Sequence, residues 1–169
     1  MSAPSAAAGG PTKSPLEGRM LPLRALAAFL ALPGVVAFVV PIWIARSAGR
    51  SVQSLTPALI LLCLGSSLLL WCVREFYFSG RGTLAPWDPP RHLVTSGPYR
   101  ISRNPMYVGV LTILAGWCTL WGSRTLIIYA AVVMISVHLR VVLFEEPWAA
   151  RRFGPEWAAY RARVPRWVF

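Results

Sequence analysis

Two long runs of this sequence, 25–45 and 51–73, contain no charged residue. Each is longer than the roughly 20 residues that a helix needs to cross the hydrocarbon core of a bilayer. A third charge-free run, 104–123, and an apolar segment, 125–144, follow them. A soluble helical core would not need four apolar segments of this length. The pattern therefore predicts an all-α fold, a polytopic membrane helical bundle with about four transmembrane helices.

The composition agrees with a membrane protein. Only 14% of the residues are charged and 56% are hydrophobic, whereas a soluble domain of this length would expose more charge. The 169 residues suit one domain, which we expect to extend over 20–169. The preceding segment, 1–19, is small, polar and rich in Pro and Gly, which predicts a disordered tail. A cleaved signal peptide is not expected, because the first apolar run starts late and is long enough to span a membrane.

Sixteen Arg and one Lys give the chain a net charge of +11. The arginines cluster beside the apolar runs, which favours an anionic membrane surface as the partner and argues against nucleic acid. With four spans, the tail, the loop near 74–103 and the C-terminal end share one side, which the positive-inside rule makes cytoplasmic. The basic residues of that side are Lys13, Arg19, Arg24, Arg74, Arg81, Arg91, Arg100, Arg103, Arg151, Arg152, Arg161, Arg163 and Arg166, and those of the other side are Arg46, Arg50 and Arg124. The preference for Arg over Lys is typical of a GC-rich bacterial genome, so we predict the bacterial inner membrane, with both termini in the cytoplasm.

The last two apolar segments are separated only by 121–124, Trp-Gly-Ser-Arg, so we expect them to form an antiparallel hairpin. The hairpin brings two polar blocks, 91–107 and 138–167, to the cytoplasmic face. We expect these blocks to converge on one pocket, with Tyr107 and Glu145 on the same side of the membrane. The end of the second block, FGPEWAAYRARVPRW, alternates aromatic and basic residues, which predicts a cytoplasmic helix lying against the lipid headgroups.

Two adjacent carboxylates, Glu145 and Glu146, directly follow the last apolar segment. If a helix ends there, its macrodipole disfavours anions, and nearby cations would have to compensate. The candidates for that compensation are Arg140, Arg151 and Arg152. One interpretation is a functional site, and the other is an ordinary ion-pair cluster at a helix end.

Two further ionisable residues, His138 and Arg140, lie within the last apolar segment. His138 and Glu145 share one face of an ideal helix, and Arg140 does not share that face. An ionisable residue inside a membrane is a functional hypothesis by default, although an arginine near a helix end can also extend to the headgroups. His138 is more often a hydrogen-bonded structural histidine than a catalyst.

In the first polar block, Asn104-Pro105 predicts the start of a helix, since asparagine can cap and proline suits the first turn. The free N–H groups of that turn can face an anionic ligand, or the asparagine can act as a cap alone. From the residues alone, Tyr99 and Tyr107 favour anchors at the membrane interface over pocket-lining residues. The cysteines, Cys63, Cys72 and Cys118, lie in apolar segments without metal-ligand spacing, so we predict buried free thiols and no metal site.

Four motifs in the two blocks, HLVTSGPY, RNPMYVG, EEPWAARRFGPEWAAY and VPRW, resemble those of the isoprenylcysteine carboxyl methyltransferase family, which includes many short bacterial members. The phospholipid N-methyltransferases look like relatives with a similar architecture. The resemblance covers 91–167 and implies an integral membrane methyltransferase that uses S-adenosylmethionine. The missing strand–GxGxxG pattern is consistent with a fold other than the soluble Rossmann type.

The resemblance also implies site residues. Those of the cofactor site are Arg91, His92, Leu93, Val94, Tyr99, Asn104, Pro105, Tyr107 and Glu145. The catalytic candidates are Arg140, Glu145 and Glu146, with Arg140 the nearest match to the substrate-orienting arginine of the family. Asn104 stands where the family usually has histidine, so it retains a donor and an acceptor but no ionisable group.

The chemistry of the methyl acceptor separates the possible reactions. A carboxylate is already anionic and needs only orientation by a cation such as Arg140, near the methyl carbon. An amine or a thiol must lose a proton, for which Glu145 or Glu146 is a candidate base. We predict a small lipophilic or prenylated acid as substrate. The alternatives are N-methylation of a phospholipid amine, an NADPH-dependent membrane reductase and a membrane module without catalysis; the sequence predicts no oligomeric state.

Overall fold

The computed structural model describes residues 30–47, 49, 51–78 and 92–168, and in these ranges the chain is helical and contains no strand. The predicted all-α class is therefore confirmed for the described residues. The predicted tail, 1–19, and Arg91 lie outside them. The helical elements are η1 (Leu30–Val39), α2 (Val40–Ser47), α3 (Leu55–Phe78), η2 (Gly97–Arg100), α4 (Pro105–Trp121), α5 (Arg124–Arg140), η3 (Val141–Glu145) and α6 (Glu146–Arg163).

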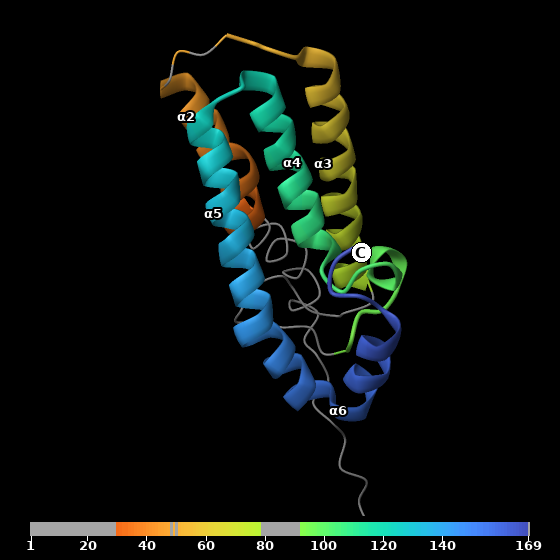
Figure 1. Ribbon diagram of the computed structural model, residues 1–169. Helices are drawn as coiled ribbons and strands as arrows, with labels where there is room; N and C mark the ends of the chain where they lie inside the picture. Colours follow the sequence, from red (N-terminus) through yellow and green to blue (C-terminus); the bar gives the residue numbers. More distant parts are fainter. Residues whose placement is uncertain (1–29, 48, 50, 79–91, 169) are drawn as a thin grey trace, which may run out of the picture.

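The bundle is organised around α4, which contacts α3, α5, α2 and η1. Figure 1 shows α2, α3, α4 and α5 running along one another, with α6 turning back from the lower end of α5. Buried side chains of α3 and α4, among them Leu69, Ile113 and Leu114, form the core between these elements. The chain thus places the start of α4 and the end of α5 at the same end of the bundle.

Helices α3 and α4 approach each other closely at a pair of glycines. A Cβ atom on Gly65 would lie 2.8 Å from the carbonyl oxygen of Gly109 and 2.8 Å from the backbone nitrogen of Ile113. Both of these are backbone atoms, which a side-chain rotation cannot move. Glycine at position 65 therefore sets the separation of the two helices, as small residues do in helix pairs within membranes.

The predicted hairpin between the last two apolar segments is present. Helix α4 ends at Trp121, and Gly122, with φ 54° and ψ 28°, donates its N–H to the carbonyl of Cys118 at 2.8 Å. Helix α5 then begins at Arg124. A left-handed glycine after the last helical residue is a common way to end a helix, and here it reverses the chain within a few residues.

Within the described residues, two helical stretches are long and apolar enough to cross a membrane, Leu55–Glu75 and Arg124–Arg163. Pro33–Ser47 and Pro105–Trp121 are shorter apolar helices, so the prediction of four spans stays a prediction. Large apolar side chains are exposed on α3 and α5, for example Leu64 at 60% and Ile128 at 65%. An apolar outer surface is what a bilayer solvates.

Cys63 is exposed as well, so the prediction of buried thiols is wrong for that residue and right for Cys72.

The helix that contains the two adjacent glutamates does not end at them. Backbone dihedral angles stay helical through Arg140, Glu145 and Glu146, so that α5, η3 and α6 form one continuous helical run. The interruption comes at Gly154, with φ 50° and ψ −121°. The expectation of an electrostatic cost at a helix C-terminus is therefore wrong, because the carbonyls after α5 are paired within the continuing helix rather than left free.

Candidate active site

Tyr107 and Glu145, one from each polar block, are in direct contact. Tyr107 lies in the first turn of α4, and its hydroxyl donates a hydrogen bond of 2.5 Å to the Oε1 atom of Glu145. Arg140 donates from Nε to the same oxygen at 2.8 Å. The structure thus brings the two segments together as expected, and three of the predicted site residues form one cluster around a single carboxylate.

The contact between Arg140 and Glu145 depends on η3, which is a π-helical turn. In an α-helix, side chains three and four residues apart are neighbours, and a pair five residues apart is not. A π turn is wider and has i→i+5 hydrogen bonds, so side chains five residues apart become neighbours. Arg140 can therefore reach Glu145. The expectation that Arg140 lies off the face of Glu145 is therefore wrong. Local π turns of this kind frequently occur at functional sites.

The cluster is accessible from outside the protein. The side chain of Arg140 is 47% exposed and that of Glu145 is 36% exposed, while Tyr107 is half-buried. An ion pair of this exposure contributes little to stability where water solvates both charges. The pair is therefore better suited to meeting a ligand than to holding the fold together.

Glu146 has a different set of partners from Glu145. Its Oε1 accepts from Arg103 Nη1 at 2.8 Å and from Arg166 Nε at 2.8 Å, and its Oε2 accepts from Arg166 Nη2 at 2.9 Å. The side chains of Arg103 and Glu146 are only 8% and 10% exposed. The Arg103 guanidinium also lies over the ring of Trp157, 5.6 Å from its centroid. These contacts favour a structural role for Glu146, so the ion-pair interpretation suits this residue better than a catalytic one.

The electrostatics of Glu146 follow from these partners. Glu146 lies beyond the apolar segment of the helix, and burial alone would raise the pKa of its carboxyl. The hydrogen bond from Arg166 and the charges of Arg103 and Arg166 outweigh burial and hold the pKa below its usual value. Glu146 therefore stays ionised and pairs with two arginines from distant parts of the chain.

Residues 164–168, the C-terminal segment, pack across the start of α4. The Arg103 N–H donates to the carbonyl of Pro165 at 2.9 Å, and the Asn104 Nδ2 donates to the carbonyl of Arg166 at 3.1 Å. The ring of Trp167 stacks on His138, with 6.1 Å between centroids. The predicted helix start at Pro105 is confirmed, but Asn104 does not cap the helix with its side chain, because that amide bonds to the C-terminal segment instead.

The remaining predicted cofactor residues lie in several surroundings. Tyr99 and Val94 are buried in one cluster with Cys72, and the Tyr160 hydroxyl donates to the carbonyl of Tyr99 at 2.7 Å. A buried side chain cannot be an interface anchor, so that interpretation is wrong for Tyr99. Leu93 packs against the core of α6, whereas His92 is exposed. Pro105 is buried where α4 starts, near Tyr107.

The sequence reasoning missed three residues that the structure places around this site. The charge pattern indicates Arg103 and Arg166 only as basic residues of the cytoplasmic side, yet both bind Glu146. Glu75 was not singled out, although its carboxylate is buried and accepts a hydrogen bond from Ser96. The position of Glu75 in the sequence could have indicated it, because it is an acidic residue just beyond the charge-free run 51–73.

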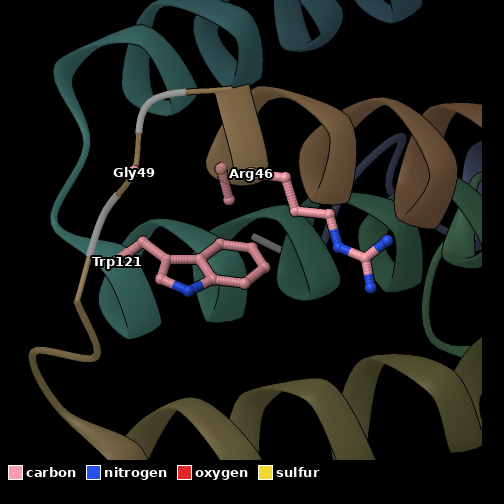
Figure 2. Close-up of a pocket in the computed structure, with 4 residues that line it drawn as sticks. Arg46, Gly49 and Trp121 are labelled. Atoms are coloured by element: carbon pink, nitrogen blue, oxygen red, sulfur yellow. The ribbon is translucent and has the colours of Figure 1, made fainter.

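A surface hollow of about 230 Å³ lies elsewhere, lined by Ala45, Arg46, Gly49 and Trp121 (Figure 2). Trp121 is the last residue of α4, whereas Tyr107 is in its first turn. At 1.5 Å of rise per residue these two positions are roughly 20 Å apart along the helix. The hollow is therefore at the other end of the bundle and is not part of the Tyr107–Glu145 site.

The phospholipid methyltransferase family matches residues 52–156, which is more than half of the chain and includes both Tyr107 and Glu145. The chain belongs to this family. The resemblance to isoprenylcysteine carboxyl methyltransferases is confirmed with it, since the matched family is of that kind. Membership, together with the two helical stretches that are long and apolar enough to cross a membrane, indicates a membrane protein.

Two curated relatives of this phospholipid methyltransferase family member are bacterial metal-resistance proteins. The cobalt-zinc-cadmium resistance protein CzcN of Cupriavidus metallidurans is 34% identical over 96 residues. The nickel-cobalt-cadmium resistance protein NccN of Alcaligenes xylosoxydans is 32% identical over 96 residues. Each match covers 57% of this chain and 40% of the relative, so the chain matches less than half the length of either. No solved structure matches the chain.

Proposed function

We propose that this family member transfers a methyl group from S-adenosylmethionine to a lipophilic acceptor at the cytoplasmic face of the membrane. The observation that carries the proposal is the hydrogen bond between Tyr107 and Glu145, with Arg140 on the same carboxylate oxygen. It joins the two sequence blocks that the family resemblance assigns to the cofactor and the acceptor. The family supplies the reaction class, and the cluster supplies a place for the reaction on this chain.

The residues of the cluster fit the chemistry of this cofactor. When bound, S-adenosylmethionine supplies an electrophilic methyl group on a positively charged sulfur. Glu145 is anionic and partly exposed, so it can attract such a cation, and Tyr107 and Arg140 fix the direction of its carboxylate. The start of α4, held by the bond from Asn104 to Arg166, offers backbone N–H groups to an anionic part of a ligand.

For the acceptor, we propose a lipophilic carboxylate. Such a group needs a cation to orient it and no base, and Arg140 is a partly exposed guanidinium beside Glu145. A phospholipid amine is the alternative, in keeping with the name of the family. It would require a base, for which Glu145 is the candidate because Tyr107 and Arg140 both donate to its Oε1 atom rather than to Oε2. The contacts of Glu146 make it a weaker candidate base.

The proposed placement in the membrane follows from the charges at the two ends of the bundle. Arg100 and Arg103 precede α4 and Arg166 contacts its start, at the end that contains the site, whereas Arg46 is near the end of α2 and Arg124 begins α5, at the other end. From the positive-inside rule we propose that the site faces the cytoplasm, with membrane lipids around α3 and α5. The four spans, the cytoplasmic termini and the bacterial inner membrane belong to this proposal.

Ligand binding by the purified protein in detergent tests the proposed cofactor. We expect saturable binding of S-adenosylmethionine, and we expect Tyr107→Phe and Glu145→Gln each to weaken it by about tenfold or more. Tyr107→Phe removes a hydrogen bond to a charged group, and Glu145→Gln removes the negative charge that we propose attracts the sulfonium. Glu156→Gln, an exposed carboxylate of α6, is the matched control and should bind as the wild type does. Binding of NADPH alone would instead indicate a reductase, and a folded sample that binds neither ligand would indicate a module without catalysis.

A transfer assay with a radiolabelled methyl donor tests the acceptor. Membrane lipid extract is divided into an acidic and an amine-containing fraction, and each is incubated with the protein. We expect label in the acidic fraction, in a form that mild base releases as methanol, because a methyl ester is base-labile and an N-methyl group is not. Label that resists base in the amine fraction would contradict the carboxylate assignment and support phospholipid N-methylation.

A further inference from the structure

Glu75 is a buried carboxylate for which the reaction described above has no use. It lies near the C-terminal end of α3, as the last residue of the membrane-length stretch Leu55–Glu75, and is 9% exposed. Burying an ionised carboxylate beside a membrane core is unfavourable unless hydrogen bonds and charges compensate. A chain that retains such a group therefore needs partners for it, and the identity of those partners indicates what it does.

Among the described residues, Glu75 has partners on its own helix and in the first polar block. Trp71 Nε1 and Arg74 Nη1 each lie 3.3 Å from Oε1, one turn and one residue before it. A further partner is distant in sequence: the Ser96 hydroxyl donates to Oε2 at 2.5 Å. Ser96 directly precedes η2, so this bond ties the block that contains Tyr99 to helix α3.

The backbone next to Ser96 lies directly on the Glu75 side chain. Gly97 has φ +56°, and a Cβ atom there would lie 3.0 Å from the Glu75 Cδ and 3.0 Å from the Trp71 Nε1. A residue with a side chain would meet both a strained backbone conformation and a tight contact that the Glu75 or Trp71 side chain would have to relieve by shifting. The turn is therefore shaped to rest against the carboxylate, which is a second observation independent of the hydrogen bond.

The turn leads directly into the candidate site. Tyr99, two residues beyond Gly97, is buried over Cys72 of α3 together with Val94, and Met106 of α4 packs on the same cluster. Met106 precedes Tyr107 in the first turn of α4. A displacement of the Ser96–Gly97 turn would thus be transmitted through packed side chains to the position of Tyr107.

We propose that Glu75 is a positioning residue: it anchors the Ser96–Gly97 turn to α3 and thereby sets the geometry of the wall formed by Val94, Tyr99 and Tyr107. It acts through Ser96 and touches no reacting atom. That this wall faces the methyl donor rests on the function proposed above, whereas the anchoring itself does not. Loss of the anchor should therefore raise KM for the donor more than it lowers kcat.

The anchoring is tested without any activity by the reactivity of Cys72, which is completely buried beneath Tyr99. In a Cys63→Ser, Cys118→Ser background, maleimide labelling of Cys72 in detergent should be slow. We expect Ser96→Ala and Glu75→Ala to speed it by about tenfold or more, since each removes a hydrogen bond to a charged group. Glu75→Gln, which keeps an acceptor for Ser96, should restore much of the protection. Thr95→Ala, next to Ser96 and exposed, is the matched control.

Kinetics with the same variants then test the positioning. We expect Ser96→Ala and Glu75→Ala to raise KM for S-adenosylmethionine by about tenfold, with kcat changed less and Glu75→Gln close to the wild type. Unchanged labelling of Cys72 in both Ser96→Ala and Glu75→Ala would overturn the proposal, as would a loss of kcat at constant KM. If the wild-type protein binds no S-adenosylmethionine, the proposed function fails, and the labelling result alone decides whether Glu75 is the anchor.

Discussion

Arg140 and Glu145 are five residues apart in one continuous helical run, and the Arg140 Nε nevertheless donates a hydrogen bond of 2.8 Å to the Glu145 carboxylate. A regular α-helix would place these side chains on different faces. The π turn η3 removes that separation. Where the apolar helix meets the polar C-terminal region, the backbone thus adopts a local geometry that places a cation beside the carboxylate contacted by Tyr107.

Arg140→Gln should therefore impair the use of an acidic acceptor while leaving the fold intact. The substitution removes the cation that we propose orients the acceptor, and an exposed ion pair adds at most about 1 kcal/mol to stability. We expect KM for the acid to rise by about tenfold, the effect of one charged hydrogen bond, with little change in the melting temperature. Arg151→Gln, an exposed arginine of α6, is the control. An equal KM in both variants would show that Arg140 does not orient the acceptor.

The two adjacent glutamates should differ sharply in their contribution to stability. Glu146→Gln leaves Arg103, which is 8% exposed, without a full negative partner, and removal of one member of a buried pair costs about 3 kcal/mol or more. Glu145→Gln affects an exposed pair and should cost about 1 kcal/mol at most. Reversible unfolding in mixed detergent measures both. Equal losses for the two variants would show that the Arg103–Glu146–Arg166 cluster does not hold the C-terminal segment.

The same cluster predicts a pH dependence of stability. Because the pKa of Glu146 is lowered below its usual value of 4.5 in the folded state, its contribution is complete above that value and is lost as the pH falls through the lowered pKa. The melting temperature of the wild type should thus exceed that of Glu146→Gln by a constant amount from about pH 7 to 5, and the difference should shrink on further acidification. A difference that stays constant down to the acid limit of the folded state would contradict this assignment.

Gly65→Ala should weaken the contact between α3 and α4. The added Cβ would meet the backbone of Gly109 and Ile113 at 2.8 Å, so the helices must move apart. Overpacking of this kind costs about 1–3 kcal/mol. Ser67→Ala, at an exposed position on the same helix, is the matched control and should change the free energy of unfolding by less than about 0.5 kcal/mol. Equal stabilities for Gly65→Ala and Ser67→Ala would mean that the helices are less closely constrained at this crossing.

Several features of the fold follow from local sequence patterns. The length of an apolar run decides whether a helix forms there, which is why the helical class and the short α4–α5 connection at Gly122 are predictable. The start of α4 at Pro105 is predictable for a similar reason, because proline lacks an N–H and suits a first helical turn. The convergence of Tyr107 and Glu145 follows from the hairpin, since antiparallel helices bring the start of one beside the end of the other.

The pairing of side chains within the site could not be derived in this way. Glu145 and Glu146 are identical in type and adjacent in sequence, yet one meets Tyr107 and Arg140 and the other meets Arg103 and Arg166. The amide of Asn104 could have capped its own helix, but it bonds to the carbonyl of Arg166. Such choices depend on which distant groups lie within hydrogen-bond distance, about 3 Å. A pattern of residue types does not locate side-chain atoms that closely.

The sequence by itself determined that this chain forms apolar helices, that the last two of these are joined by a tight turn, and that its two polar blocks lie at the same end of the bundle. Only the tertiary structure decided which carboxylate joins the cluster around Tyr107, which one secures the C-terminal segment, and that Glu75 of α3 holds the Ser96 turn. The physical reason is that helix formation depends on the local pattern of residues, whereas the partner of a side chain depends on the face of the helix from which that side chain projects. A single π turn between Arg140 and Glu146 changes the face from which the following side chains project, without changing the apolar pattern.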